Sequence, residues 1–587
     1  MRWVLRNADS QDVQRLALES GLPVATAQLL TVRGIRTAEQ AHKFLSPSLQ
    51  DLHSPVLMTG LRVAVGRLRA AIERGETVLI YGDYDVDGTT AIVILKTAIE
   101  LCGGRTEHHV PHRIREGYGM RDEVIEQAAD RGIRVIISVD TGIRAFAAGE
   151  TAQRSGIDLI VTDHHLPQAN GLPKALAVVN PNQEGCEYPC KSLCGAGVAF
   201  KIAQALLEET GRERLLPSFL KMVAIATIAD AVPLIGENRV FAKLGLEGLR
   251  KPVNAGLRAL LANCQLDGSR PLSASDIAFR VAPLLNAAGR MDVAEHVIQL
   301  FTEKDTTKAA DIAIRLNQLN GDRQLEEQRI IEEIHRKIED SPEMKEAYCL
   351  VLEGEGWHRG VIGICATRVV ERYRRPTLIF ACEDGEAHGS GRSIEAFHLL
   401  QALEACPELF TRFGGHAHAV GCALPVEKIP ELRSRLDAFA RERLTPQDFV
   451  PVLNYDAEIS LDEVKHDFWL LLQKLEPFGS GNPVPVFVAR NTKLVQPPRV
   501  LKEKHLKLRV AANDRNSNGK GFPRAYDALG WRMAERLTQE SLLLGSTLDL
   551  AFTVDYNEHP EFGGVQVNLL DFAQGAAIAS AAAATEG

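Results

Sequence analysis

Short apolar runs alternate with amphipathic stretches through the first half of the chain. The amphipathic stretches include one from Leu61 to Arg74, with Gly75 as a C-cap, and one that continues from Thr89 to Ile99. Four apolar runs are rich in β-branched residues and too short for a helix, which predicts strands over 78–81, 134–140, 158–163 and 176–179. Strands that alternate with helices in this way predict a parallel α/β sheet.

The pattern changes twice in the second half. A charged amphipathic helix is predicted from Gly321 to Ile338, ended by Pro342, and is typical of a connector between two lobes. The α/β alternation then restarts, with a strand over 348–352, a helix over 361–373, a strand over 377–380 and Gly-rich turns over 389–393 and 413–421. Beyond residue 451, short strands with frequent Pro and Gly indicate a small β-barrel.

These changes predict a multidomain α/β protein. Its parts are a parallel-sheet domain, a long connecting helix, a second α/β domain and an OB-like β-barrel. Ser10 and Thr37 are expected to cap helices in the first segment. The expected segments are a helical lead-in over 1–50, the parallel-sheet domain over 51–320, the connecting helix over 321–345, the second α/β domain over 346–446, the barrel over 451–572 and a disordered Ala-rich tail over 573–587.

Composition is that of a globular protein, since 45% of the 587 residues are hydrophobic and 24% are charged, with a net charge of −9. No apolar run approaches the roughly 18–20 residues of a membrane span, and the N-terminus lacks the apolar region of a secretory signal. The ten cysteines are scattered, as expected for reduced thiols. We therefore expect a cytoplasmic protein that does not contact a membrane, and a monomer.

Three closely spaced cysteines, Cys186, Cys190 and Cys194, could hold zinc. No fourth Cys or His lies close by, and the usual CxxC pair is missing. Free thiols are the expected state.

The first predicted strand leads directly into three aspartates, Asp83, Asp85 and Asp87, with Gly88 closing the turn. No Lys or Arg lies among them, so burying the run without a partner would cost several kcal/mol, and a divalent cation would relieve that cost. The alternative is a solvated acidic turn. An EF-hand is a poorer match, because the twelfth position counted from Asp83 is Ile94 rather than Glu.

Other apolar segments also end on side chains that can bind a metal. Asp140 ends the second predicted strand, Asp163, His164 and His165 follow the third, and Asp230 follows an apolar helix-like segment. In open parallel sheets, ligands gather at the carboxyl ends of the strands. Carboxylates with an imidazole suit Mn²⁺ or Mg²⁺, and two such ions could hydrolyse a phosphate ester with Asp140 as the bridging ligand. The ligand candidates are Asp85, Asp87, Asp140, His164 and Asp230.

Several further residues could contact a phosphate. His165 could be a packed core histidine, but beside a metal ligand it is well placed to donate a hydrogen bond to a phosphate. Arg113 and Arg290 could be surface charges or phosphate contacts. Arg392 is a stronger candidate, because the glycines on both sides of Ser390 would let backbone N–H groups approach an anion.

Charge reverses in the predicted barrel. Between Arg490 and Arg509 there are seven Lys or Arg residues against Glu503 alone. Basic strands with interleaved aromatic rings suit single-stranded nucleic acid, although an ordinary solvated sheet face is the alternative. The basic residues and rings that follow are Arg515, Lys520, Phe522, Arg524, Tyr526, Trp531 and Arg532.

Four of these stretches together resemble the motifs of the DHH phosphoesterases. They are residues 83–88, 139–142, 163–165 and 229–231. Gly414 to Gly421 resembles the glycine-rich signature of the domain that accompanies them, and Glu476 to Pro483 leads into a basic barrel as in the single-strand-specific DNA exonucleases of that superfamily. The resemblance extends from about residue 50 to 570, and the metal motifs show no departure from the family pattern.

The resemblance implies a site for two Mn²⁺ or Mg²⁺ ions in the cleft between the DHH domain and the associated domain. One ion would be bound by Asp85 and Asp140, and the other by Asp87, Asp140, His164 and Asp230. Asp83 would lie in or next to the first coordination shell, and His165 would contact the scissile phosphate. The residues that would grip the 5′ end of a strand are Arg113, Arg290, Ser390, Arg392 and His416.

The activity that the resemblance implies is 5′→3′ degradation of single-stranded DNA to 5′-mononucleotides, in DNA repair and recombination. Single-strand-binding protein and a RecQ-type helicase would be partners. Two alternatives stay open: a phosphodiesterase of short oligonucleotides or other small substrates, and a non-catalytic relative that binds DNA or a replication partner. The basic barrel disfavours the first, and the intact ligand motifs disfavour the second.

Overall fold

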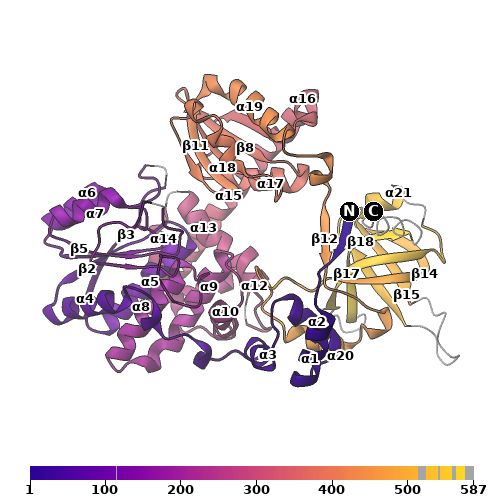
Figure 1. Ribbon diagram of the computed structural model, residues 1–587, viewed down its shortest axis with the longest axis horizontal. Helices are drawn as coiled ribbons and strands as arrows, with labels where there is room; N and C mark the ends of the chain where they lie inside the picture. The colour runs from indigo at the N-terminus through magenta and orange to yellow at the C-terminus, as the bar shows by residue number, and fades with distance from the viewer. Residues whose placement is uncertain are drawn as a thin grey trace. The chain divides into compact units, whose positions relative to one another are not determined.

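The computed structural model describes residues 1–113, 115–168, 170–266, 268–291, 293–512, 524–539, 542–557 and 563–574 (Figure 1). The chain divides into two compact units: Leu49–Pro451 forms one, and Met1–Ser48 with Val452–Gly587 forms the other. The disordered tail expected over 573–587 lies outside the described residues from residue 575 onward. None of the helices in the described ranges has the length and apolar character needed to cross a membrane.

A five-stranded parallel sheet forms the first half of the Leu49–Pro451 unit, in the order β3-β2-β4-β5-β6. Its strands are β2 (Thr77–Tyr81), β3 (Arg105–His109), β4 (Val135–Val139), β5 (Asp158–Thr162) and β6 (Ala177–Val179). All four strands predicted here from apolar runs are present. The sequence did not predict β3, because this edge strand reads Arg-Thr-Glu-His-His and has no apolar run.

Helices cover both faces of this sheet (Figure 1). Val78 and Ile80 of β2 pack with α4 (Leu61–Arg74), α5 (Val86–Leu101) and α8 (Gly195–Glu209), whereas Leu79 and Tyr81 pack on the other face with α6 (Asp122–Asp130) and α7 (Phe146–Arg154). From the central pair of β2 and β4, the chain adds β3 on one side of the sheet and β5 and β6 on the other. Such a switch in direction leaves a crevice at the carboxyl ends of the two strands, where ligands bind in open α/β sheets.

A single 35-residue helix, α15 (Thr306–Asp340), joins the two lobes of this unit. Its first half packs Ala313 and Leu316 into the core of the parallel-sheet lobe, and its second half packs Ile330 and Ile334 into the next lobe. The helix begins at Thr306 rather than near residue 321, because Asp305 caps it and its first turns belong to the earlier core. Before it lie α9 (Leu220–Ala229), α10 (Gly236–Leu249), α11 (Ala255–Asn263), α13 (Ala282–Arg290) and α14 (Glu295–Thr302).

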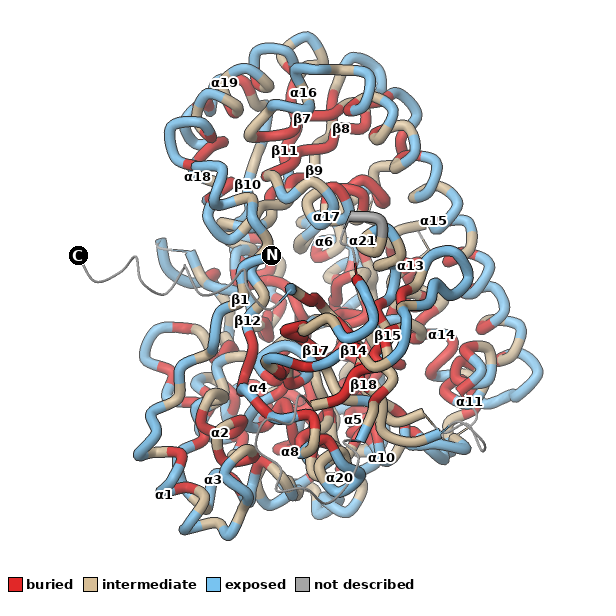
Figure 2. Tube along the Cα trace, turned by 90° about the vertical axis from the view of Figure 1, so that its right-hand side faces the viewer, coloured by how far each residue is buried: buried red, intermediate tan, exposed pale blue. Residues whose placement is uncertain are grey.

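The second lobe is a five-stranded mixed sheet in the order β10-β11-β9-β8-β7. Figure 2 shows that β7 and β8 are mostly buried, whereas β10 at the edge of the sheet is largely exposed. One face packs against α17 (Ile362–Tyr373), and the other against α18 (Leu399–Glu404) and α19 (Ile429–Arg441). The strands are β7 (Leu350–Glu355), β8 (Thr377–Glu383), β9 (Glu386–Arg392), β10 (Arg412–Gly415) and β11 (Ala419–Pro425).

The prediction of Gly-rich turns over 389–393 and 413–421 was wrong, because most of both stretches lies in strands. Gly389 is required by packing, since a Cβ there would lie 2.3 Å from a ring carbon of Phe380. Gly391 is similar, because a Cβ would lie 2.7 Å from Leu399. Glycine can therefore mark a crowded strand as well as a turn.

The other unit joins both ends of the chain. Strand β1 (Arg2–Leu5) pairs in parallel with β12 (Val452–Tyr455), so the first segment is not purely helical as expected. Helices α1 (Ser10–Ser20), α2 (Val24–Val32) and α3 (Ala38–Leu45) follow and share a core with the barrel. Thr37 caps α3 as predicted, with a reciprocal hydrogen bond from Gln40, but the cap of α1 is Asp9 rather than Ser10.

The predicted barrel is present. Strands follow the order β14-β15-β16-β18-β17, and β17 also pairs with β14, which closes the barrel. Short β13 (Ala457–Glu458) extends the edge of β14, and α20 (His466–Gln473) packs against the same core. The barrel strands are β14 (Phe487–Leu501), β15 (His505–Ala511), β16 (Ala525–Gly530), β17 (Thr547–Asn557) and β18 (Gly564–Gln574).

Candidate functional site

The three aspartates of the first motif lie where β2 gives way to α5. Asp83 follows the strand, Asp85 caps the helix by accepting a hydrogen bond from Gly88 N–H at 3.0 Å, and Asp87 lies in the first turn. Gly88 is therefore inside the helix and does not close a turn, which corrects the sequence prediction. A Cβ on Gly88 would lie 2.7 Å from the backbone of Asp83, so glycine lets the helix approach the strand end.

Asp140 follows β4, on the other side of the crevice, in a left-handed conformation with φ of 60°. Its Oδ1 lies 3.1 Å from Nε2 of His164, and the same nitrogen lies 3.8 Å from Asp87 and 3.9 Å from Asp230. The predicted ligands and their neighbours thus converge from four segments of the chain. Three groups have ligand atoms within 4.8 Å of one another: Asp83, Asp85 and Asp140; Asp87, His164 and Asp230; and Asp140, His164 and His165.

The electrostatics of this cluster favour a bound cation. Burial, followed by the Asp85 carboxylate, raises the pKa of Asp83 well above its ordinary value, and burial with repulsion from neighbouring aspartates does the same to the pKa of Asp140. Burial, with repulsion from Asp87 and Asp85, raises the pKa of Asp230 to about 8. Oδ1 of Asp83 and Oδ1 of Asp140 are buried without a hydrogen-bond partner among the described residues. Buried carboxylate oxygens without donors, beside an imidazole, fit Mn²⁺ or Mg²⁺.

The carboxylate of Asp87 is held by the N-terminus of α8. Gly195 N–H donates to Oδ2 at 2.5 Å and Ala196 N–H donates to Oδ1 at 2.7 Å. A Cβ on Gly195 would also lie 2.4 Å from Cβ of Asp140, so this glycine lies between two ligand candidates. Sequence reasoning missed this contact, although the small residues at 195–197, in the first turn of a helix, were a signal for an anion-binding N-terminus.

Asp163 has a different role from the ligand candidates, because its hydrogen bonds order the loop after β5. It accepts hydrogen bonds from Ile143 N–H, His164 N–H and His165 N–H, and its Oδ1 lies 2.7 Å from Nδ1 of His165. Burial lowers the pKa of His165, but the hydrogen bond and charge of Asp163 outweigh it and raise that pKa to about 9. The imidazole is therefore oriented and held as a proton donor beside the cluster.

Two asparagines after β6 complete this support. Asn180 Nδ2 donates to the carbonyl oxygen of His165, and Asn182 Nδ2 donates to that of His164. The sequence places these amides at the end of a strand, but it does not show that they support the histidine loop, because their hydrogen-bond partners lie on that separate loop.

A cavity of about 650 Å³ lies beside Tyr84, the residue between Asp83 and Asp85. The Arg113 guanidinium lies over the ring of Tyr84, 4.8 Å from its centre. Arg290 Nη1 donates to the carbonyl oxygen of Gly360 at 3.1 Å. The structure thus brings four predicted phosphate contacts into one cavity, namely Arg113, Arg290, Ser390 and Arg392, whereas His416 does not line it.

The chemistry expected around Ser390 needs correction. The residue lies in β9, whose backbone pairs with both β8 and β11, so its N–H groups belong to the sheet and do not form an anion-binding turn. The side chains remain available: Arg392 Nη1 lies 3.4 Å from Ser390 Oγ and 2.8 Å from the Gly391 carbonyl oxygen. A phosphate here would be bound by hydroxyl and guanidinium groups.

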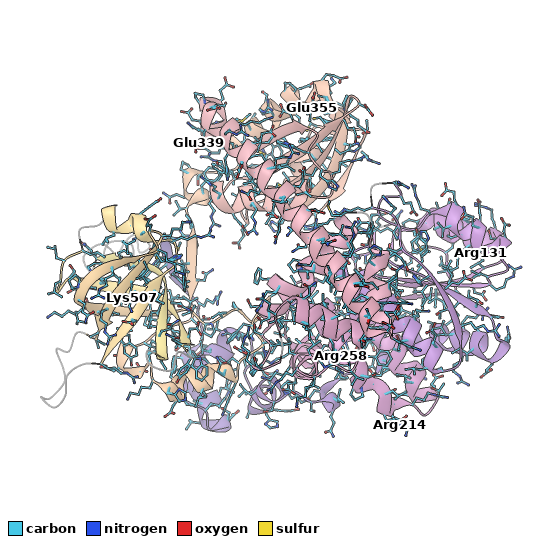
Figure 3. The ribbon with its side chains drawn as sticks, turned by 180° about the vertical axis from the view of Figure 1, so that it is seen from behind. Arg131, Arg214, Arg258, Glu339, Glu355 and Lys507 are labelled. Carbon is cyan, nitrogen blue, oxygen red and sulfur yellow. The ribbon has the colours of Figure 1, made fainter. Side chains whose placement is uncertain are left out.

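The basic face of the barrel is smaller than its sequence suggested. Lys507 and Arg509 of β15 pair with Asp527 on β16, at 2.8 and 2.7 Å, and Arg490 pairs with Glu458 and Asp549. Figure 3 labels Lys507 on this barrel. The predicted Arg515, Lys520 and Phe522 lie outside the described residues.

Only one of the two described rings predicted for base stacking is exposed. Tyr526 is 2% exposed and belongs to the core, whereas Trp531 is 58% exposed and packs edge-on against His505 at 4.9 Å. Four cations that lie near Trp531 in the sequence or on the neighbouring strands have no acidic partner among the described residues. They are Arg499, Lys502, Lys504 and Arg532.

Cys186, Cys190 and Cys194 form no disulfide bond within the described part of the chain. Sγ of Cys194 lies 3.7 Å from the Thr227 hydroxyl in the core, and none of the three belongs to a potential metal group within the described part of the chain.

Comparison with known proteins agrees with this arrangement. Sequence models of three families match the chain: the DHH family, N-terminal domain, over residues 77–227, the DHHA1 domain over 346–442 and the RecJ OB domain over 455–571. The fold and the acidic site therefore define a multidomain protein of the DHH class.

Whole-chain relatives narrow that class. The chain is 35% identical over 563 residues to the single-stranded-DNA-specific exonuclease RecJ of Bacillus subtilis, covering 95% of this chain and 69% of the relative. It is 35% identical over 565 residues to the enzyme of the same name from Dickeya dadantii, covering 92% and 94%. The chain belongs to the RecJ family.

Solved structures are similar as well. RecJ from Thermus thermophilus in complex with Mn²⁺ matches with a TM-score of 0.81 at 28% identity, covering 98% of this chain and 79% of that one. An exonuclease RecJ bound to manganese matches with a TM-score of 0.60 at 32% identity, covering 69% and 99%. Both relatives hold manganese, the type of ion that the donor set of this chain fits.

Proposed function

We propose that this protein is a metal-dependent exonuclease that degrades single-stranded DNA from its 5′ end and releases 5′-mononucleotides. The proposal rests on one observation: a candidate metal site and a candidate phosphate site adjoin each other in the Leu49–Pro451 unit. A buried carboxylate and imidazole cluster lies at the β2–β4 crevice, and the cavity lined by arginines begins at Tyr84, within the same motif. One site fits the ions, and the other fits a terminal phosphate.

The ligand assignment follows the two acidic groups. Asp85 and Asp140 would hold one ion, with Asp83 beside it, while Asp87, His164 and Asp230 would hold the second ion together with the bridging Asp140. Two bound ions supply an activated water and stabilise the leaving oxygen of a phosphate diester. Asp87 needs its hydrogen bonds to the N-terminus of α8 to keep one oxygen directed at the cluster.

The residues of the chain itself perform the positioning. His165, kept protonated by Asp163, donates a hydrogen bond to a non-bridging oxygen of the scissile phosphate. Arg113, Arg290 and Arg392 hold the 5′-phosphate, which fixes the first phosphodiester over the ions. A strand presented by its 3′ end has no terminal phosphate for these guanidinium groups, which supports 5′→3′ polarity.

The barrel supports a polymeric substrate. Trp531 offers an exposed ring for a base, and the neighbouring Lys502 and Lys504 offer cations for phosphates. Stacking with phosphate contacts of this kind binds single strands without sequence preference. Single-strand-binding protein and a RecQ-type helicase as partners, a role in DNA repair and recombination, a monomeric state and a cytoplasmic location remain predictions that rest on the resemblance and the sequence.

The test is cleavage of end-labelled oligonucleotides in the presence of Mn²⁺. A 5′-labelled single strand should release labelled mononucleotide at once, whereas a 3′-labelled strand should shorten gradually and blunt duplex should persist. Release of labelled mononucleotide first from the 3′ end would refute the proposed polarity. Cleavage of dinucleotides only would favour the small-substrate alternative.

A further inference from the structure

Three basic side chains in the arginine cavity have no task in gripping a 5′-monophosphate. Arg359, Arg412 and His388 all line this cavity. Arg359 has no hydrogen bond or ion pair with any described residue, and Arg412 Nη2 lies 3.5 Å from His388 Nδ1. Guanidinium groups that line a cavity without a carboxylate partner are placed to bind an anion.

The sheet register separates these groups from the 5′-phosphate site. Arg412 of β10, Ala423 of β11 and His388 of β9 form one row across the sheet. Ser390 lies two residues farther along β9, and Arg392 lies two residues beyond Ser390. Alternate residues of a strand lie on the same face, about 6.6–6.8 Å apart. The basic group of Arg359, Arg412 and His388 therefore shares one face with the 5′-phosphate group of Ser390 and Arg392, and His388 is one such spacing from Ser390 and two from Arg392.

No side chain fills the sheet surface beside Ser390, between the two groups of basic residues. In the row of Ser390, β10 and β11 contribute Gly414 and Gly421, which pair with each other. A Cβ at either position would meet no atom within 4 Å. The cavity volume of about 650 Å³ is that of a small-molecule site, so this face has room for more than one phosphate.

Charges around the cavity agree with two anionic positions. Burial and the Arg412 charge lower the pKa of Arg359, with Glu383 and Glu386 opposing them. Glu386 itself pairs with Nε2 of His388 at 3.2 Å. The single acidic side chain among the lining residues is Glu116, which is occupied by His109 at 3.0 Å and by the N–H of His112. An anion at Arg359 and Arg412 would therefore meet a net positive charge.

The two basic groups differ in their relation to the carboxylate cluster. Burial and the Arg113 and Arg323 charges lower the pKa of Arg290 to about 10, and the Asp85 carboxylate opposes that shift. Arg113 lies over the ring of Tyr84, the residue between Asp83 and Asp85, and Gly289, next to Arg290, packs against the backbone of Tyr84. The 5′-phosphate site thus lies between the carboxylates and the second basic group. A strand that runs from the 5′-phosphate site to the cluster leads away from Arg359, so only groups attached beyond the 5′-phosphorus can reach it.

We propose that Arg359, Arg412 and His388 form a second anion subsite, which takes the outer phosphates of a single strand whose 5′ end carries a triphosphate. This inference rests on the proposed function. The spacing of about 6.6–6.8 Å between His388 and Ser390 matches the reach of a short polyphosphate from a phosphate bound at Ser390. The protein would then start on polyphosphorylated ends without a separate enzyme to trim them.

The chemistry at the cluster stays a phosphodiester hydrolysis. Water attacks the phosphorus between the first and second nucleotides, and its oxygen bonds to that phosphorus. The bond to the 3′-oxygen of the first nucleotide breaks, and that oxygen takes up a proton. The phosphoanhydride bonds are untouched, so the first product is a nucleoside 5′-triphosphate and every later product is a 5′-monophosphate.

The experiment compares two single-stranded DNA oligonucleotides of one sequence, with a 5′-triphosphate or a 5′-monophosphate, and the full-length protein with Mn²⁺. Anion-exchange chromatography identifies the first nucleotide released, and kcat/KM is measured for each end. The triphosphorylated strand should yield nucleoside triphosphate. In the double variant Arg359→Gln/Arg412→Gln, the ratio of kcat/KM for triphosphate over monophosphate should fall tenfold or more.

Arg435→Gln is the matched control. Arg435 lies on α19, on the opposite face of the same sheet, where it pairs with Glu408. The substitution removes one cation from the same lobe, and it should leave the ratio of kcat/KM for the triphosphorylated over the monophosphorylated strand unchanged. The inference is overturned if the first product of the triphosphorylated strand is a monophosphate, if only the monophosphorylated strand is cut, or if the double variant keeps the ratio. Failure to cut either strand would instead refute the proposed function.

Discussion

The backbone N–H of Gly195 donates a hydrogen bond to Oδ2 of Asp87 over 2.5 Å, and the Cα of the same glycine faces Asp140. One helix N-terminus thus orients one ligand candidate and limits the space of another. Because a helix N-terminus carries partial positive charge, it also attracts the carboxylate of Asp87.

Gly195→Ala should therefore disable the site. The new Cβ would lie 2.4 Å from Asp140 Cβ, so the helix or the aspartate must move. A shift on the order of 1 Å can cost about 100-fold in rate, and we expect a loss of that size in kcat together with weaker Mn²⁺ binding.

Gly197→Ala is the control, two residues along α8. Its Cβ would meet Leu193 at 3.4 Å, an ordinary contact, and alanine favours the helix by about 1 kcal/mol. Activity and melting temperature should be at least those of the parent. Equal rates for the two variants would contradict the role assigned to Gly195.

Without metal ions, the protein should lose stability as pH rises. Asp230 has a folded-state pKa of about 8, above the value of the unfolded chain, and the pKa of Asp140 is also raised. The folded state therefore binds these protons more tightly, and the stability they contribute disappears as pH rises through the folded pKa. In chelator, the melting temperature should fall between about pH 5 and pH 8.

Mn²⁺ should reverse that loss, because it binds the ionised carboxylates. At 100 times its Kd, a bound ion adds about 2.7 kcal/mol to the free energy of unfolding. Asp230→Asn should flatten the pH dependence in chelator, whereas Asp311→Asn, at an exposed position of α15, should not. A melting temperature insensitive to both pH and Mn²⁺ would argue against a metal cluster.

Asp163→Asn tests the orientation of His165. Asparagine removes the charge that raises the His165 pKa to about 9, so the proton donor should be lost at lower pH. We expect kcat to fall by about 10–100-fold, as for other residues that orient a functional histidine, and its alkaline decline to begin at least one pH unit earlier.

Asp158→Asn is the comparison for this variant, at the opposite end of β5. Asp158 pairs with the half-buried Arg67 at 2.6 Å, a contact worth about 1 kcal/mol, and Glu76 remains as a second partner of Arg67. Its removal should leave the pH profile in place. If the two variants share one profile, Asp163 has only a structural role.

Asp140→Asn should separate binding from cleavage. Asparagine tolerates the left-handed backbone at this position, so the loop should keep its conformation. Loss of the carboxylate that we propose as the bridge between the two ions should reduce cleavage by at least about 1,000-fold, as expected when a metal site is disabled. Binding of a 5′-phosphorylated strand, measured by fluorescence anisotropy, should stay within about threefold of the parent. Equal loss of both would argue against the bridging role.

The barrel unit should matter for long strands more than for chemistry. Removal of both Met1–Ser48 and Val452–Gly587 should leave cleavage of short oligonucleotides and weaken binding of long ones. Removal of Val452–Gly587 alone should cause aggregation, because Leu16, Leu30 and Phe44 would lose the barrel side of their core. Unchanged processivity of the Leu49–Pro451 fragment on long strands would refute the role of the barrel.

Local pattern explains most of what the sequence predicted. Buried strands such as β4 are recognisable as β-branched runs, and a carboxylate that ends such a run, as Asp140 does, is visible in the sequence alone. Convergence of Asp140 with His164 follows from one rule, because parallel strands bring their carboxyl ends to the same edge.

Long-range partners explain what the sequence did not predict. Gly195 reaches Asp87 from 108 residues away, and β1 pairs with β12 across most of the chain, so neither relation leaves a periodic signal. The basic stretch of the barrel was overcounted for the same reason. Asp527 neutralises Lys507 and Arg509 from the neighbouring strand, and a count along the chain does not show that.

The pairing of β1 with β12 also sets an order for synthesis. Trp3 Nε1 donates to Asp571 at 2.8 Å, so Trp3 is made 568 residues before its partner. Ribosomes add about 5–20 residues per second, and the roughly 400 residues between the two halves of this unit take on the order of 20–80 s to make. During that interval the leading helices have no core to join. The apolar side of Met1–Ser48 therefore stays uncovered until the strands of the barrel have been made.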